Sequence, residues 1–172
     1  MALIKTRARG LKLDDTFPFT GTVSGAGGGK LNQVVQVENT TDLDLSSNTY
    51  TNFYSGSITP SATSSKVLVF WTVHSRSMTS VNGYGAKLKR GSTDVWTSTR
   101  DYFVYSEDSS SDRHSTMFMY LDSPSTTSAT TYQIQVACNG SNNVQFSGNS
   151  NQSLMTLMEI LAWLEFQMLY IV

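Results

Sequence analysis

The chain has 172 residues, a formal net charge of −1, and charged side chains at only 15% of its positions. Serine and threonine make up roughly a quarter of it, a composition that favours strands and turns over helices. A net charge this close to zero gives no general attraction to nucleic acids or anionic membranes. The single cysteine, Cys138, excludes an internal disulfide framework and is predicted to be a small packing residue within a strand. We therefore expect an all-β protein with no specific nucleic-acid partner.

Residues 1–30 differ from the rest of the chain. A short basic segment is followed by apolar residues spaced by twos or fours, as on one face of an extended segment, and then by the glycine-rich run 25–29. Such a glycine run predicts a flexible hinge. We expect 1–30 to be an arm that anchors the protein to a partner, although a solvated start remains an alternative for the basic residues. The candidate anchoring residues are Arg7, Arg9, Leu11, Leu13, Phe17 and Phe19.

From residue 31 onward, short apolar runs alternate with polar turn clusters, a pattern typical of a β-sandwich or barrel. Residues 66–74 form the strongest predicted strand. Its valines and Trp71 would line one face, with Leu68, Phe70 and Thr72 on the other, so we expect both faces to be buried. The predicted strands span 32–38, 52–58, 66–74, 83–89, 93–98, 114–121, 131–137, 143–147 and 153–161. Their number and spacing predict an antiparallel jelly-roll sandwich over residues 31–161.

The C-terminal residues 154–172 are almost wholly apolar. Glu159 and Glu165 make a membrane span costly, so we expect no membrane insertion. Both a helical stripe and a strand alternation fit parts of the segment. Because an exposed segment this apolar would aggregate, residues 162–172 are expected to form an apolar tail that its own domain or a neighbouring subunit covers. The candidate oligomer-interface residues are Leu154, Leu157, Leu161, Trp163, Phe166 and Leu169.

Nothing in the sequence predicts a catalytic residue, a metal site or a cofactor. The glycine run that ends at Lys30 departs from the phosphate-loop and dinucleotide patterns. Two histidines and one cysteine are too few for a structural zinc site, although a metal ion shared between subunits stays open. The acidic loop 106–112 fits either a calcium site or a solvated loop tip. Residues 112–115 include Asp, His and Ser, but a catalytic triad is defined by geometry and not by adjacency.

Aromatic residues gather around 83–105. Aromatic faces beside hydroxyl and amide groups suit contact with a glycan or a protein surface, whereas the alternative is that several of them fill the core. The candidate receptor contacts are Tyr84, Trp96, Tyr102 and Tyr105.

Three segments resemble a family of short virion and tail-fibre proteins of marine bacteriophages: SGSITPSATSSKVLVF within 52–70, YLDSPSTTSATTYQIQVA at 120–137 and SLMTLMEIL at 153–161. The opening ARGLKLDDTFPFTGTVSG at 8–25 is similar to N-terminal segments of such proteins. The resemblance covers most of residues 8–161 and implies a trimeric jelly roll of the C1q or TNF kind with no catalytic residues. The chain continues beyond the point where members of this family tend to finish.

The resemblance implies a non-enzymatic virion protein, assembled in the bacterial cytoplasm as a homotrimer that binds other virion proteins of the portal, tail or capsid. We expect a fibre-like appendage that contacts a host-surface glycan or protein. The alternative is a capsid decoration protein that stabilises the shell. A carbohydrate-degrading depolymerase belongs to a different class and would need a positioned pair of carboxylates, which the sequence does not indicate.

Overall fold

The computed structural model describes residues 31–77, 82–98, 103–106, 112–139, 143–147 and 151–161. The elements formed by these residues are all strands, and no helix among them is long and apolar enough to cross a membrane. The strands are β1 (Leu31–Asn39), β2 (Leu43–Leu45), β3 (Thr51–Ile58), β4 (Lys66–Ser77), β5 (Asn82–Arg90), β6 (Thr93–Thr97), β7 (Val104–Ser106), β8 (Arg113–Asp122), β9 (Thr130–Cys138), β10 (Val144–Phe146) and β11 (Ser153–Ile160).

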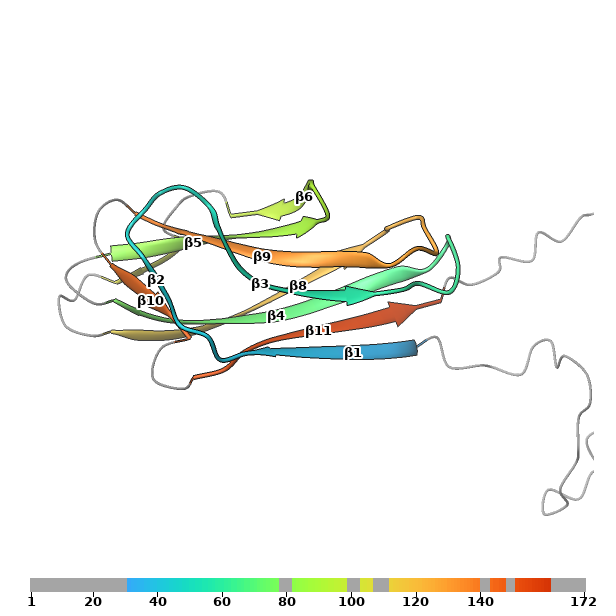
Figure 1. Ribbon diagram of the computed structural model, residues 1–172, viewed down its shortest axis with the longest axis horizontal. Coiled ribbons are helices and arrows are strands. Elements are labelled where there is room, and N and C mark those ends of the chain that lie inside the picture. The colour runs from blue at the N-terminus through green and yellow to red at the C-terminus, as the bar shows by residue number, and fades with distance from the viewer. Residues whose placement is uncertain are drawn as a thin grey trace, which may run out of the picture.

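The strands form two antiparallel sheets that pack face to face (Figure 1). The six-stranded sheet, called sheet A here, has the order β1-β11-β4-β10-β2, with β8 on the other side of β4. The five-stranded sheet, sheet B, has the order β3-β9-β5-β6, with β7 also paired to β5. The chain crosses repeatedly between the sheets, and strands far apart in sequence pair, as β1 does with β11. This is the antiparallel jelly-roll sandwich that the strand spacing predicts.

The core lies between the sheets and follows the predicted alternation. Val67, Val69 and Val73 are 0% exposed and Trp71 is 1% exposed, because alternate residues of β4 point toward sheet B. In β9, the three predicted inward residues, Tyr132, Ile134 and Val136, are likewise fully buried. Cys138 is also buried and donates its thiol hydrogen to the carbonyl oxygen of Leu45, which confirms that it is a packing residue.

Gly56 of β3 packs closely against sheet A. A Cβ atom added there would lie 2.9 Å from Cγ2 of Val37 and 3.2 Å from the sulfur of Met155. We expect Gly56→Ala to lower the free energy of unfolding by about 1–3 kcal/mol, since the strands must move apart to admit a methyl group. Urea denaturation measures this loss, with Ser57→Ala, at an exposed neighbouring position, as the control. Equal urea midpoints for Gly56→Ala and Ser57→Ala would show that the two sheets do not pack tightly at Gly56.

The structure differs from the predictions in two places. β2 and β7 have three residues each and were not predicted, because such short strands show too little alternation to be recognised. The helical alternative for the C-terminal segment is wrong over Ser153–Ile160, which pairs with both β1 and β4. There, Leu154 and Leu157 point to opposite faces of sheet A instead of sharing one helical stripe.

The two ends of the sandwich carry different parts of the chain. β1 begins and β11 ends side by side, since Leu31 pairs with Ile160, and this end is called the arm end (Figure 1). The segments 1–30 and 162–172 both adjoin these strands in sequence and lie outside the described residues. The opposite, distal end carries Ser77 of β4 together with β2, β7 and β10. The strand rise of about 3.3 Å per residue makes the twelve-residue β4 about 36 Å long.

Candidate functional site

The outer face of sheet A is apolar over parts of β11, β4 and β8, and Val34 of β1 extends this area. The register aligns Val34, Met158, Leu68 and Leu121 in one row across β1, β11, β4 and β8. The next row adds Phe70 of β4 and Met119 of β8. The row after it adds Leu154 of β11 and Met117 of β8, which lie on either side of Thr72. On β8 the exposed fractions are 71% for Met117, 63% for Met119 and 54% for Leu121, and Val34 is 51% exposed. An isolated sandwich normally presents polar side chains on such a face, so a contiguous apolar surface of this kind marks an interaction site.

The outer face of sheet B provides the internal comparison. Most of its outward residues on β3, β9, β5 and β6 are polar or charged: Asn52, Ser55, Ser57, Thr131, Gln133, Gln135, Lys87, Lys89 and Asp94. Lys87 forms an ion pair with Asp94 at 2.7 Å, which lowers the pKa of that carboxyl. Solvent is the expected neighbour of such a face. The difference between the two faces shows that the apolar surface of sheet A is specific to one side of the molecule.

A shallow hollow lies in the apolar face of sheet A. It has a volume of about 280 Å³ and lies above Thr72 and Thr156, the two small side chains of the face. Larger side chains border it, namely Phe70, Met117, Leu154 and Met158. A depression bounded by bulky apolar groups receives a protruding apolar side chain well, and buried anchors of this kind dominate binding energies at protein interfaces.

A buried carboxylate, that of Glu159, joins several elements at the arm end. Glu159 is 0% exposed, and its two oxygens accept hydrogen bonds from Asn32 Nδ2 and Gln33 Nε2, each at 2.8 Å, and from the backbone nitrogen and the hydroxyl of Ser61 at 2.6 and 2.7 Å. Burial raises the pKa of a carboxyl group, but these hydrogen bonds outweigh burial and lower the pKa of Glu159 to about 2. One carboxylate thus joins β1, β11 and the turn after β3 at the point where the arm and the tail adjoin the sandwich.

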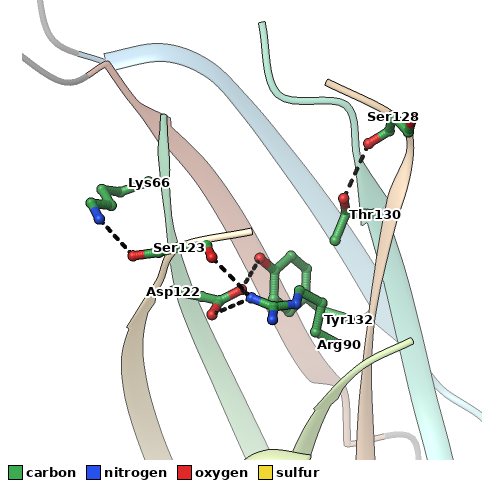
Figure 2. Close-up of polar contacts among 7 residues, drawn as sticks. All are labelled: Lys66, Arg90, Asp122, Ser123, Ser128, Thr130 and Tyr132. Atoms are coloured by element: carbon green, nitrogen blue, oxygen red, sulfur yellow. Dashed lines mark hydrogen bonds and ion pairs between the residues drawn. The ribbon is translucent and has the colours of Figure 1, made fainter. Parts of the chain in front are cut away.

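A second polar cluster at the arm end joins the two sheets (Figure 2). Nη1 of Arg90 donates to both carboxylate oxygens of Asp122 at 2.8 Å and to the carbonyl oxygen of Ser123 at 3.1 Å. The hydroxyl of Tyr132 donates to the same carboxylate at 2.7 Å. Burial, together with this hydrogen bond to Asp122, raises the pKa of Tyr132. Asp122 is on β8 of sheet A, whereas Arg90 and Tyr132 are on sheet B, so the cluster holds the sheets together.

Replacing Asp122 by alanine is expected to lower the free energy of unfolding by about 3–5 kcal/mol. The change would leave the guanidinium of Arg90 and the buried hydroxyl of Tyr132 without their acceptor. Thermal denaturation at fixed protein concentration measures the loss. Ser123→Ala is the matched control, because it removes only the exposed hydrogen bond from Lys66 and keeps the carbonyl that Arg90 contacts. A variant at Asp122 as stable as this control would show that the cluster does not stabilise the fold.

The predicted interface residues fall into three groups. Leu154 is on the outer face of sheet A and borders the hollow, and Leu161 follows β11 with its side chain partly exposed. Leu157 is 0% exposed inside the sandwich, so it is a core residue and cannot contact a neighbouring subunit. The other three, Trp163, Phe166 and Leu169, lie outside the described residues, as do the six anchoring residues of the arm.

The predicted receptor contacts are also divided. Tyr84 is 2% exposed, and burial raises its pKa to about 12, so it belongs to the core. Trp96 packs its ring against Trp71 and Phe118, with centroids 5.6 and 5.3 Å apart, at the rim of the same core. Tyr105 is 46% exposed on β7, beside Phe103 at 51%, and Tyr102 lies outside the described residues. For Tyr84, the structure therefore favours the alternative that the aromatic residues fill the core.

The outward residues of β8 were not among the candidates predicted from the sequence. The signal was available, because Met117, Met119 and Leu121 alternate with Phe118 and Tyr120 and make the strand apolar on both faces. The same reasoning predicted that β4 is buried on both faces. Its inner face is buried, but Leu68 and Phe70 on its outer face are only partly covered within one chain.

No catalytic arrangement forms from the residues singled out in the sequence. His114 and Ser115 are neighbours in a strand and therefore point to opposite faces. The hydroxyl of Ser115 lies 2.6 Å from Nδ1 of His74 instead, and His114 Nε2 lies 3.5 Å from a carboxylate oxygen of Asp112. Across the described ranges, no three His, Cys, Asp or Glu residues lie close enough together to hold a metal ion.

Comparisons with known proteins give partial likenesses only. No protein-family model matches the chain, and no curated protein matches it. Among solved structures, that of the infectious bursal disease virus Gx strain has a TM-score of 0.47 and 12% identity over 86% of this chain. For the T13 particle of the same virus, the TM-score is 0.45 and the identity is 11% over 87% of this chain. For the VP2 subviral particle of this virus, the TM-score is 0.44 and the identity is 9% over 76% of this chain. This chain spans only 42%, 41% and 38% of those chains, respectively, and at these scores the likeness does not extend to function.

Proposed function

We propose that this chain is a non-enzymatic structural protein of a bacteriophage virion, which assembles as a homotrimer through the outer face of sheet A. The observation that carries the proposal is the apolar surface on this face, in contrast to the mainly polar outer face of sheet B. Exposed apolar residues on an edge strand such as β8 would promote aggregation if they stayed uncovered. The phage assignment and the trimer rest on the resemblance of the segments within 8–161 to phage virion proteins.

The proposed interface extends the predicted one. Leu154 keeps its predicted place and is joined by the outward residues of β4, β8 and β11, while Leu157 is left to the core. In this proposal Leu161 and the apolar tail residues Trp163, Phe166 and Leu169 add to the same interface, because the tail follows β11 at the arm end of the apolar face. Burying side chains of this type contributes roughly 1.5–3 kcal/mol each.

Deleting residues 162–172 is expected to weaken the trimer or to make the protein aggregate, because part of the apolar face would lose its cover. Light scattering coupled to size-exclusion chromatography, over a dilution series, measures both outcomes. The control is a full-length variant in which the exposed Thr97 of sheet B is replaced by serine. A soluble trimer of unchanged dilution behaviour after the deletion would show that the tail is not part of the interface.

The role within the virion is proposed to be that of a fibre-like appendage. The arm 1–30, with its six candidate anchoring residues, would bind a portal, tail or capsid protein. The distal end, where Tyr105 is exposed about one strand length from the arm end, would then face a host glycan or protein. The alternative of a capsid decoration protein shares the fold, the trimer and the arm but requires no receptor.

Locating the protein in virions by cryo-electron microscopy tests the proposal directly. Density for the jelly roll on the tail supports an appendage, density on the shell supports a decoration protein, and absence of the protein from particles would refute both. Competition of purified protein with phage adsorption separates the first two roles, because only a receptor-binding appendage should block adsorption. Release of reducing sugar from host polysaccharide would overturn the non-enzymatic assignment.

A further inference from the structure

The hollow in the outer face of sheet A has the chemistry of a site for one aromatic side chain. Its volume is about 280 Å³, equal to roughly nine water molecules at 30 Å³ each, and its border consists of aliphatic and aromatic groups. Among the described residues that line it, none carries a charge. The floor is not wholly apolar, because Thr72 and Thr156 bring hydroxyl groups there. An occupant that is apolar, uncharged and equipped with one hydrogen-bond donor therefore fits the hollow best.

The hydroxyl of Thr72 can serve as an acceptor for such a donor. Its oxygen accepts the backbone N–H of Leu154 at 2.8 Å, and a hydroxyl oxygen has two lone pairs. The indole nitrogen of a buried tryptophan usually has an acceptor, whereas phenylalanine, leucine and methionine bring no donor. A tryptophan therefore matches both the apolar border of the hollow and its floor.

The C-terminal tail, residues 162–172, contains one tryptophan, Trp163. The tail carries a single charged side chain, that of Glu165, so its composition suits a hollow without charge. It follows β11 at the arm end and lies outside the described residues. Eleven residues extend at most about 40 Å, which is enough to reach across to a second copy of the sandwich.

Trp163 is too close in sequence to β11 to occupy the hollow of its own chain. The hollow lies above Thr156, which is four residues and about 13 Å along β11 from Ile160. Three residues span at most about 11 Å, so even a chain that reverses at Ile160 cannot bring the backbone of residue 163 above Thr156. A tight reversal is also disfavoured, because residues 160–164 contain none of the glycine, proline, asparagine, aspartate or serine that turns use.

From these observations we infer that Trp163 of one subunit inserts its indole ring into the hollow of a neighbouring subunit, so that the subunits exchange their C-terminal tails. The indole N–H donates to the hydroxyl of Thr72, and the ring packs between Met117 and Leu154, which lie on either side of that threonine. This docking rests on the proposed self-association through the outer face of sheet A, and it identifies the residue that anchors the association. Buried aromatic anchors of this kind dominate the binding energy of many interfaces.

Cross-linking of the full chain by a short bismaleimide tests the inference. Met117 borders the hollow and Ala162 precedes the anchor, so Met117→Cys combined with Ala162→Cys supplies two thiols close to the docked ring. The native Cys138 is buried and should not react. We expect covalent species of two and three chains on a denaturing gel, with a bridge between positions 117 and 162 that mass spectrometry of the linked peptides identifies.

Two further variants make the test specific. Ser55→Cys combined with Ala162→Cys is the matched control, because Ser55 is exposed on the outer face of sheet B and should not be linked to the tail. Adding Trp163→Ala to the variant with cysteines at positions 117 and 162 should lower the rate of cross-linking about tenfold or more, as expected when a buried anchor is lost. Circular dichroism establishes that each variant is folded.

Three results would overturn the inference. One is a bridge within a single chain, which would show that the tail covers its own hollow. Another is a trimer in sedimentation velocity that forms no bridge between positions 117 and 162, in which case the proposed trimer would stand and the tail would lie elsewhere. The third is cross-linking that Trp163→Ala leaves unchanged. A soluble monomer, by contrast, would refute the proposed assembly together with the docking of the tail.

Discussion

Replacing Met119 by aspartate is expected to separate the proposed trimer into folded monomers. Met119 is 63% exposed in the single chain and lies beside Phe70 on the outer face of sheet A. In the monomer, therefore, an aspartate there remains solvated, and the free energy of unfolding should change by less than about 0.5 kcal/mol. In the trimer the same carboxylate would be buried without a partner, which costs several kcal/mol and should raise the dissociation constant by roughly 100-fold or more.

Sedimentation velocity over a range of concentrations measures this shift. Ser55→Asp adds the same charge to an exposed position on the outer face of sheet B and should leave the trimer intact. Circular dichroism of both variants establishes that the sandwich is folded. Dissociation by both substitutions alike would indicate a general effect of charge, and dissociation by Ser55→Asp alone would place the interface on sheet B.

The second large effect is a loss of stability that we expect on replacing Glu159. Its pKa is lowered from an ordinary value of 4.5 to about 2 in the folded protein. A carboxyl group whose folded pKa is depressed stabilises the fold fully above its unfolded pKa and loses that contribution as the pH falls toward the folded value. At 1.36 kcal/mol per pKa unit the contribution is about 3 kcal/mol, present above about pH 4.5 and lost between there and pH 2.

Glu159→Gln should therefore lower the free energy of unfolding by about 3 kcal/mol at pH 7, and the difference from the unmodified protein should shrink as the pH approaches 2. Guanidinium denaturation at pH 7, 4 and 3, at one protein concentration, measures this convergence. Glu38→Gln is the matched control, because Glu38 is an exposed acid on the neighbouring strand β1. A constant difference between the Glu159 variant and the unmodified protein across this pH range would contradict the account of the carboxylate.

The sequence predicts the core of the fold well because local alternation determines which side chains face inward. The inward residues of β4 and β9 were identified by their period of two, and all are buried. The two polar clusters could not be predicted in this way. Glu159 is separated from Asn32 and Ser61 by 127 and 98 positions, and Arg90 from Asp122 by 32, so only the pairing of distant strands brings them together.

The candidate surface could be predicted only in part, for a related reason. The sequence indicates that β4 is apolar on both faces, but whether a second face is covered depends on which sheet and which subunit lie against it. Tyr84 and Leu157 illustrate the same limit. Both are apolar or aromatic residues in strands, and a displacement of one position would have placed them on the surface. Their burial follows from the register with β9 and with β1 and β4, which the sequence does not specify.

The central claim is that the apolar outer face of sheet A joins copies of this chain. Sedimentation equilibrium of the full chain at micromolar concentration tests it most directly. The account predicts a single species of three times the 18.9 kDa of one chain. A stable, soluble monomer of 18.9 kDa would contradict it, because the exposed methionines and leucines of β8 would then have no subunit to cover them.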